Sequence, residues 1–234
     1  MPILNGTKLL ARARRYADDV AEPYYISDTE MYTWLTEAES ALARAGMLIR
    51  DVVTYTVNST TSSRWVRIRS TPEIIEVRKA VLIDSNGNRY PLKLEGVLST
   101  DPMTSEDEDY GVIAPVASLT PGRPLIMGFG RRTNYFELRP VSDGAYTIEA
   151  YVVTYPTYPI ERAGDEPTIA ERYHPDIAIG AALMALEGTD DEQLVDRARG
   201  LERAWAAALK RAEGESTSLD RDSTEVRFSN DMWV

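Results

Sequence analysis

The chain has 234 residues, enough for one large domain or two small ones with a substantial core. Its 37 Asp and Glu residues outnumber its 26 Lys and Arg residues, and the formal net charge of −11 argues against binding nucleic acid by phosphate neutralisation. The absence of cysteine excludes disulfides and thiol chemistry, and without a signal-like or bilayer-length apolar run we expect a soluble protein with no membrane partner.

The front of the chain shows helical periodicity. Apolar residues at steps of three and four, ending at Val20, predict an amphipathic helix over residues 5–20. Ser27 and Glu30 form a capping box that predicts a second helix over residues 28–45, with Gly46 as its left-handed stop. The outer, solvated side of the first helix is expected to carry Lys8, Arg12, Arg14 and Arg15.

The middle of the chain changes to a period of two, which is typical of strands. Val53, Tyr55 and Val57 alternate with polar residues, and two short strand patterns follow between Ile74 and Asp84. Asn86 and Gly87 predict a hairpin with a type I′ turn. A second hairpin is expected from strands at 135–138 and 145–155, joined by a turn at 140–144.

The back of the chain returns to helical spacing. Pro175 suits the first turn of a helix over residues 175–187, which Gly188 ends. Thr189 and Glu192 form another capping box, predicting a helix over residues 190–212. The side chains expected inside the packed helices are Trp34, Leu42, Leu194, Leu201 and Trp205.

These elements predict an α+β fold in three parts. Residues 1–50 and 160–213 would form an antiparallel helical bundle, with two N-terminal and two C-terminal helices. Residues 51–159 would be an inserted antiparallel β-sandwich or barrel. Residues 214–234, rich at first in Gly, Ser, Thr and charge, would be a flexible, extended C-terminal tail.

No pattern in the chain identifies an active site, a metal site or a cofactor site. His174 is the only histidine, and no Gly-x-Ser-x-Gly elbow is present to place a nucleophile beside it. Asp84 to Asn88 has its glycine at the wrong position for a calcium loop. We interpret Glu106, Asp107, Glu108 and Asp109 as part of a long exposed acidic loop.

The end of the tail is unlike the rest of it, because apolar and aromatic residues return there. Such a segment is typical of an anchor that becomes ordered on a partner. The alternative is a terminus that folds back on its own domain. The residues that would make this contact with a partner are Val226, Phe228, Met232, Trp233 and Val234.

The order of these parts resembles the head-to-tail adaptor proteins of tailed bacteriophages, of the podovirus tail tubular type. The resemblance covers about residues 5 to 213 and lies in order and character rather than in an invariant motif. The segments that carry it are Met31 to Ala38, Ala43 to Gly46, Tyr135 to Pro140, Tyr146 to Tyr151, and Tyr173 to Glu187.

The resemblance implies a structural virion protein in the neck between head and tail. It implies a homo-oligomeric ring, commonly of twelve copies, that binds the portal protein on one side and the tail nozzle or tube on the other. The C-terminal segment would reach the portal, and double-stranded DNA would contact the ring only in transit through its channel. An acidic body and the acidic loop suit such a lumen, because they would not hold DNA in place. Assembly would take place in the host cytoplasm.

Two other classes of function stay open. The β domain could be a binding module for a carbohydrate or a peptide, with Trp65, Tyr135 and Tyr155 as stacking platforms. A cell-wall hydrolase would need a pair of carboxylates across a cleft, and sequence alone cannot select that pair among 37 acids.

Overall fold

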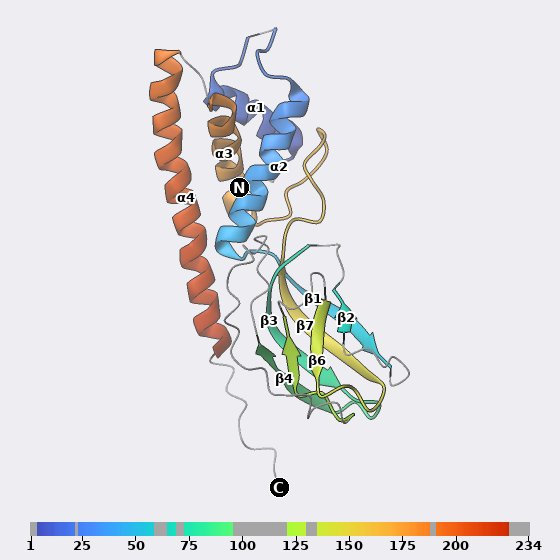
Figure 1. Ribbon diagram of the computed structural model, residues 1–234. Helices are drawn as coiled ribbons and strands as arrows, with labels where there is room; N and C mark the ends of the chain where they lie inside the picture. Colours follow the sequence, from blue (N-terminus) through green and yellow to red (C-terminus); the bar gives the residue numbers. More distant parts are fainter. Residues whose placement is uncertain are drawn as a thin grey trace, which may run out of the picture. The chain divides into compact units, whose positions relative to one another are not determined.

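The computed structural model describes residues 4–21, 23–58, 65–68, 73–95, 121–129, 135–187 and 191–224. Side chains at position 65 and at 216–224 lie outside this description. The chain divides into two compact units (Figure 1). We call residues 1–49 with 156–234 the helical unit, and residues 50–155 the sheet unit.

Helices α1 (Gly6–Ala17) and α2 (Asp28–Gly46) open the helical unit. The predicted capping box of α2 is confirmed, since the Ser27 hydroxyl accepts from the amide of Glu30 and the Glu30 carboxylate accepts from the amide of Ser27. Helix α1 is shorter than predicted, because Asp18 adopts a left-handed conformation with φ 66° and Val20 lies outside the helix.

The expected stop of α2 at Gly46 is wrong. Gly46 is helical, and Met47 is the left-handed residue, with φ 47°. Gly46 instead permits close packing: a Cβ added there would lie 2.9 Å from the Cβ of Ala212 in α4. A glycine near a helix end can therefore signal a close approach as well as a left-handed cap.

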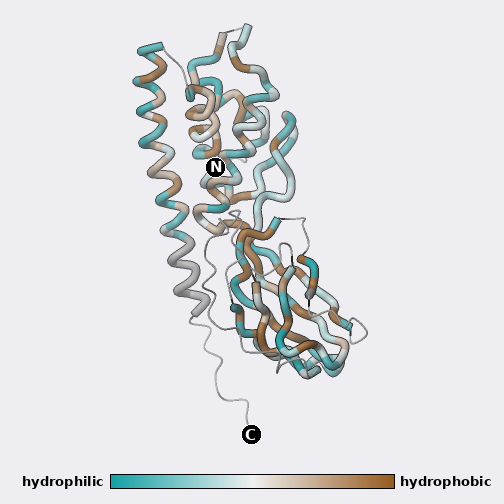
Figure 2. Tube along the Cα trace, in the orientation of Figure 1, coloured by the Kyte–Doolittle hydropathy of each residue, from teal (hydrophilic) through white to brown (hydrophobic). Residues whose placement is uncertain are grey.

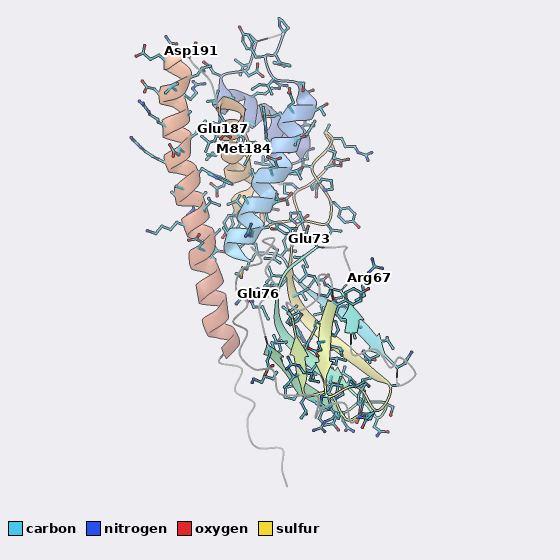
Figure 3. All side chains as sticks on the ribbon, viewed as in Figure 1. Arg67, Glu73, Glu76, Met184, Glu187 and Asp191 are labelled. Carbon is cyan, nitrogen blue, oxygen red and sulfur yellow. The ribbon has the colours of Figure 1, made fainter. Side chains whose placement is uncertain are left out.

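A short 3₁₀ turn, η1 (Glu171–Tyr173), leads into α3 (His174–Leu186), and α4 (Glu192–Thr224) follows. Asp191 caps α4, because its Oδ1 accepts from the amides of Gln193 and Leu194 at 2.9 and 3.4 Å (Figure 3). The helix therefore starts two residues later than the capping box at Thr189 predicted, and Thr189 lies outside the described residues.

All four helices contribute to one apolar core. Leu9 of α1, Leu35 of α2 and Ile177 of α3 are fully buried in it, and Ala208 and Ala212 bring α4 to the same cluster. Figure 2 shows apolar residues recurring between polar ones along α4. Of the five side chains predicted to be inside, only Leu42 is fully buried. Trp34 and Trp205 pack against this cluster and are partly exposed. Leu194 and Leu201 are also partly exposed and pack against a smaller apolar cluster.

Helix α4 continues to Thr224, beyond the predicted end at residue 212. Residues 214–224 of the predicted flexible tail are therefore helical. No proline interrupts this stretch, and a helix already fixed by packing can extend through polar residues at little cost per residue. The remaining positions, 225–234, lie outside the described residues.

Within its described residues, the sheet unit contains seven strands in the order β1-β7-β3-β4-β5-β6-β2. Neighbouring strands are antiparallel except for β4 and β5, which are parallel. Their bounds are β1 Arg50–Val57, β2 Trp65–Arg67, β3 Ile74–Ile83, β4 Arg89–Glu95, β5 Ile126–Gly128, β6 Tyr135–Arg139 and β7 Tyr146–Thr154.

The sheet curls into a nearly closed barrel around an apolar interior. The ring of Tyr55 on the edge strand β1 meets the ring of Phe136 on β6 edge to face, with 5.0 Å between centroids. These strands stand near opposite ends of the sheet order, so the sheet must bend to bring them together. Val53, Tyr55 and Val57 are buried as their alternation predicted.

Three strand predictions need correction. The two patterns between Ile74 and Asp84 form one strand, β3, with two register shifts against β7. The 84–88 hairpin is not type I′, because a type I′ turn needs two residues with positive φ and only Gly87 has one here. It is a three-residue loop with a left-handed glycine. The Asp84 carboxylate stabilises this loop by accepting from the amides of Asn86 and Asn88. No hairpin joins β6 to β7, which pair with other strands.

The predicted α+β class is confirmed, with two helices before the sheet and two after it. The sheet is one curled layer, mixed rather than purely antiparallel because of the parallel β4–β5 pair.

Candidate functional site

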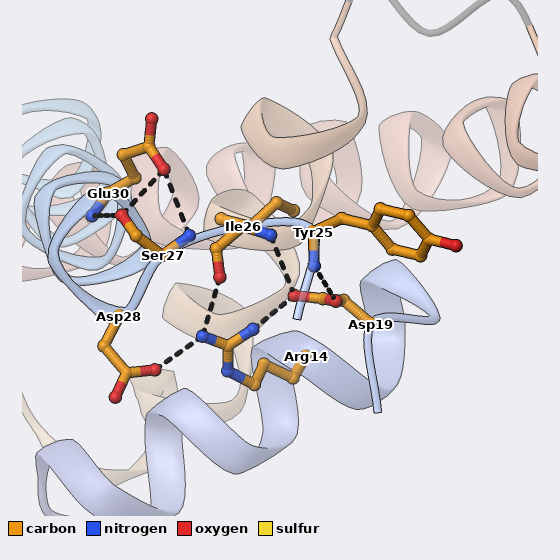
Figure 4. Close-up of polar contacts among 7 residues, drawn as sticks. All are labelled: Arg14, Asp19, Tyr25, Ile26, Ser27, Asp28 and Glu30. Carbon is orange, nitrogen blue, oxygen red and sulfur yellow. Dashed lines mark hydrogen bonds and ion pairs between the residues drawn. The ribbon is translucent and has the colours of Figure 1, made fainter. Parts of the chain in front are cut away.

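The most elaborate polar arrangement in the helical unit fixes the connection between α1 and α2 (Figure 4). The Arg14 side chain is 6% exposed, and its guanidinium donates to the carboxylates of Asp19 and Asp28 and to the carbonyl of Ile26. The Tyr24 ring lies over the same guanidinium, 3.8 Å from Cζ to centroid. This one arginine therefore ties the end of α1 to both sides of the connection.

Asp19 completes the arrangement from the other end. Its side chain is 3% exposed, and its oxygens accept from the backbone amides of Tyr25 and Ile26 at 2.9 and 3.4 Å. A buried carboxylate needs such partners, because removing a charge from water without them costs several kcal/mol. We call residues 18–21 and 23–27 the anchor loop, since the backbone at positions 25 and 26 is held by this buried pair.

The anchor loop places apolar side chains in solvent. Tyr25 is 95% exposed, Val20 58% and Tyr24 42%. Exposed carboxylates flank them, at Asp28, whose side chain is 60% exposed, and at Glu30. A backbone held by buried ion pairs beneath exposed tyrosines is typical of a preorganised contact surface.

The burial of Arg14 corrects the expectation that this side chain lies on the solvated side of α1. Leu10, Arg14 and Ala17 are spaced by four and three, which puts Arg14 beside the apolar stripe. From that spacing the burial of Arg14 could have been predicted. The spacing could not reveal Asp19 as the partner, because the turn that brings Asp19 back to Arg14 follows the helix.

A second buried carboxylate fastens the segment before α3 to α2. The Glu39 side chain is fully buried, and its Oε1 accepts from the amides of Thr168 and Ile169. Its Oε2 has no hydrogen-bond partner among the described residues. Burial raises the pKa of the Glu39 carboxyl to about 7, and the two amides oppose the shift.

His174 has a structural position at the start of α3. Its Nε2 lies 3.0 Å from the carbonyl oxygen of Ile169, and its Nδ1 accepts from the amide of Leu4 at 3.3 Å. A carbonyl can only accept and an amide can only donate, so these partners select the neutral Nε2–H tautomer. Both ring nitrogens are engaged in holding the backbone, which favours the structural interpretation of His174 over a catalytic one.

Helix α4 packs through one side and leaves the other to solvent. Asp176 of α3 accepts from Arg211 at 2.9 and 3.0 Å, and Trp205 fills the space above Gly180. At about 100° per residue, Arg203 and Lys210 point away from this packed side. Both are exposed, as is Ala207 between them.

The predicted functional residues fall mainly outside the described part of the chain. This holds for the acidic loop at 106–109 and for the five C-terminal residues, at 226, 228 and 232–234, that are expected to bind the portal. Of the proposed stacking aromatics, Tyr135 begins β6 and Tyr155 follows β7, and three strands stand between β6 and β7 in the sheet order. Strand pairing therefore does not bring these two tyrosines together.

Within the described residues, no three His, Asp or Glu side chains are placed to hold a metal ion. Over the same part of the chain, no helix combines the length and apolar character needed to cross a membrane.

The described residues combine a helical unit and a curled sheet with exposed apolar side chains on the anchor loop, features that fit a protein whose role is to bind other proteins. A family model described as SU10 adaptor protein matches residues 5–228, nearly the whole chain. The chain therefore belongs to the SU10 adaptor protein family. A comparison with curated proteins gives no match. Membership confirms the resemblance to phage head-to-tail adaptors, and it makes the protein a structural adaptor of a phage virion that contacts other virion components.

Proposed function

We propose that the protein is the head-to-tail adaptor of a tailed phage, a ring of twelve copies that joins the portal to the tail nozzle or tube. The match to the adaptor family over residues 5–228 carries this proposal. The ring assembles in the host cytoplasm and becomes part of the virion neck, where double-stranded DNA passes through its channel.

The charge of the chain supports a role around passing DNA. The net charge is −11, and a wall of that sign repels phosphates, whereas a basic channel would hold the duplex. In this proposal the acidic loop, Glu106 to Asp109, faces the lumen.

The C-terminal end supplies the portal contact in this proposal. Helix α4 carries the chain as far as Thr224, two residues before Val226. Burying large apolar side chains contributes about 1.5 to 3 kcal/mol each, and ordering the segment offsets part of that gain. Attachment of one copy is then weak, and neighbours in a ring strengthen one another through high effective concentration.

Electron microscopy of the purified protein mixed with the portal assembly tests the proposal. The expected result is a ring of added density on one face of the portal. A carbohydrate- or peptide-binding module, or a hydrolase, requires no such ring. A portal with no added density at saturating protein would contradict the proposal.

A further inference from the structure

We propose that the anchor loop docks on the outward face of α4 in a second copy of this chain, and that this contact joins neighbouring subunits. The proposal rests on the ring proposed above and assigns residues to its subunit contact. Its two halves are the exposed side chains of Val20, Tyr24 and Tyr25 with the carboxylates beside them, and the cationic surface of α4 around Ala207.

The anchor loop presents a large exposed side chain on a fixed backbone. Tyr25 is 95% exposed although its amide is bonded to the buried Asp19, so its backbone is fixed while its side chain is open to solvent. Little conformational entropy is left for a partner to remove from that backbone. Tyrosine is also among the residues that dominate protein contacts, because it combines a large apolar ring with a hydroxyl.

The charge around the anchor loop selects the partner. Asp28 uses Oδ1 for Arg14, and Glu30 uses Oε2 for Ser27, so each carboxylate has a second oxygen that makes none of these bonds. The Ser27 hydroxyl and amide lower the pKa of Glu30, which keeps its charge. The loop therefore fits a surface that offers cations around a small apolar position.

The outward face of α4 is such a surface. Arg203 and Lys210 lie one heptad apart on it, and Ala207 stands between them with a side chain short enough to admit a ring. Arg199 adds a third cation on the same side, where it forms a surface pair with Asp196 at 3.1 Å. Surface pairs of this kind exchange partners readily, because each contributes at most about 1 kcal/mol.

Two copies can make the contact in a way that one copy does not. Within one chain the anchor loop meets its own α4 through the ion pair of Asp18 with Arg197, at 3.0 Å, whereas Tyr25 is almost completely exposed and does not cover that helix. The anchor loop and the outward face of α4 are different surfaces, so their contact is heterologous and leaves one of each for the next copy. Repetition of such a contact closes a ring when the rotation per subunit divides a full turn.

The first test measures the protein concentration at which rings form on the portal. Tyr25→Ala and Arg203→Glu should each raise that concentration at least about tenfold, the scale of a central contact residue. Tyr158→Ala is the matched control, since Tyr158 is a 76% exposed tyrosine of the same unit outside both surfaces. Unchanged melting of all three variants would establish that they fold. Ring formation by Tyr25→Ala at the parent concentration would overturn the inference.

The second test uses the absence of cysteine in the sequence. Tyr25→Cys and Ala207→Cys chains are mixed on the portal and treated with a short bis-maleimide, at a protein concentration high enough to offset the weaker ring formation expected without the Tyr25 ring. Covalent dimers should exceed, by at least about tenfold, those from a mixture of Tyr25→Cys with Glu37→Cys, an exposed position of α2. Rings without this excess would overturn the subunit contact and leave the adaptor proposal standing. The absence of any ring from the parent chain would overturn both.

Discussion

At the scale of single residues, Glu39 makes stability depend on pH. Burial raises its folded-state pKa from 4.5 to about 7, so the folded protein holds this proton more tightly than the unfolded chain. The stabilisation is complete below about pH 4.5 and is lost as the pH rises through about 7. The Glu39→Gln variant does not lose stability in this way, because its side-chain amide does not titrate. Its unfolding free energy relative to the parent should therefore rise by up to about 3 kcal/mol between about pH 4.5 and 8.

Denaturant unfolding across this pH range measures the effect. Glu37→Gln is the matched control, because Glu37 is exposed on the same helix and should leave the pH profile of the parent unchanged. A constant difference between Glu39→Gln and the parent at every pH would show that the buried carboxyl does not titrate as described.

His174 should matter for stability and not for chemistry. Truncation by His174→Ala leaves the amide of Leu4 and the carbonyl of Ile169 without their partner, at a cost of about 1 to 3 kcal/mol. Chemical denaturation checks the stability, and a cell-wall hydrolysis assay checks the chemistry. Hydrolysis by the parent that disappears in the variant would establish the catalytic role that the geometry disfavours.

Interactions between residues close in sequence could be predicted more readily than interactions between distant ones. Ser27 and Glu30 are three positions apart, and their reciprocal capping could be predicted because both partners lie in one turn. The contact of Glu39 with Thr168 joins positions 129 apart, and nothing in the spacing of either residue indicates the other. The buried pair of Arg14 and Asp19 joins positions only five apart, but it depends on the left-handed turn after α1, which helical spacing does not predict.

At the scale of elements, the packing of α4 depends on a glycine in α3. A Cβ at position 180 would lie 2.7 Å from Cζ3 of Trp205 and 2.9 Å from the Cβ of Ala38. Gly180→Ala should therefore destabilise the protein by about 1 to 3 kcal/mol through overpacking.

Gly200→Ala is the control for this prediction. An added Cβ there meets nothing within 4 Å, so the better helix propensity of alanine should stabilise α4 by up to about 1 kcal/mol. Thermal melts of both variants would show opposite shifts. A Gly180→Ala variant as stable as Gly200→Ala would refute the three-helix contact at this point.

Element type could be predicted from the sequence more fully than element pairing. The periodicities of 3.6 and 2 marked all four helices and most strands. β5 is only three residues long, too short to show a period, and it supplies the parallel partner of β4. β6 and β7 looked like a hairpin because they are consecutive, but the curled sheet gives each of them other partners.

At the scale of the whole molecule, the final residues should carry the portal attachment. Ending the chain after Thr224 removes the apolar segment and keeps all of α4. Ending it after Glu213, where the predicted tail begins, would also remove the last part of this helix. We expect unchanged melting and at least about a tenfold loss of portal binding, because the removed side chains form the proposed contact. Normal portal binding by this shortened chain would place the attachment elsewhere.

Assembly of the protein as a ring on the portal can be measured through the mass of the complex. One subunit has a mass of 26.2 kDa, so a ring of twelve copies adds about 314 kDa to the portal. Native mass spectrometry of a titration should show this increment appearing in one cooperative step, since neighbours stabilise one another. A portal whose mass does not change, or one that binds scattered single copies without reaching a fixed number, would contradict the account.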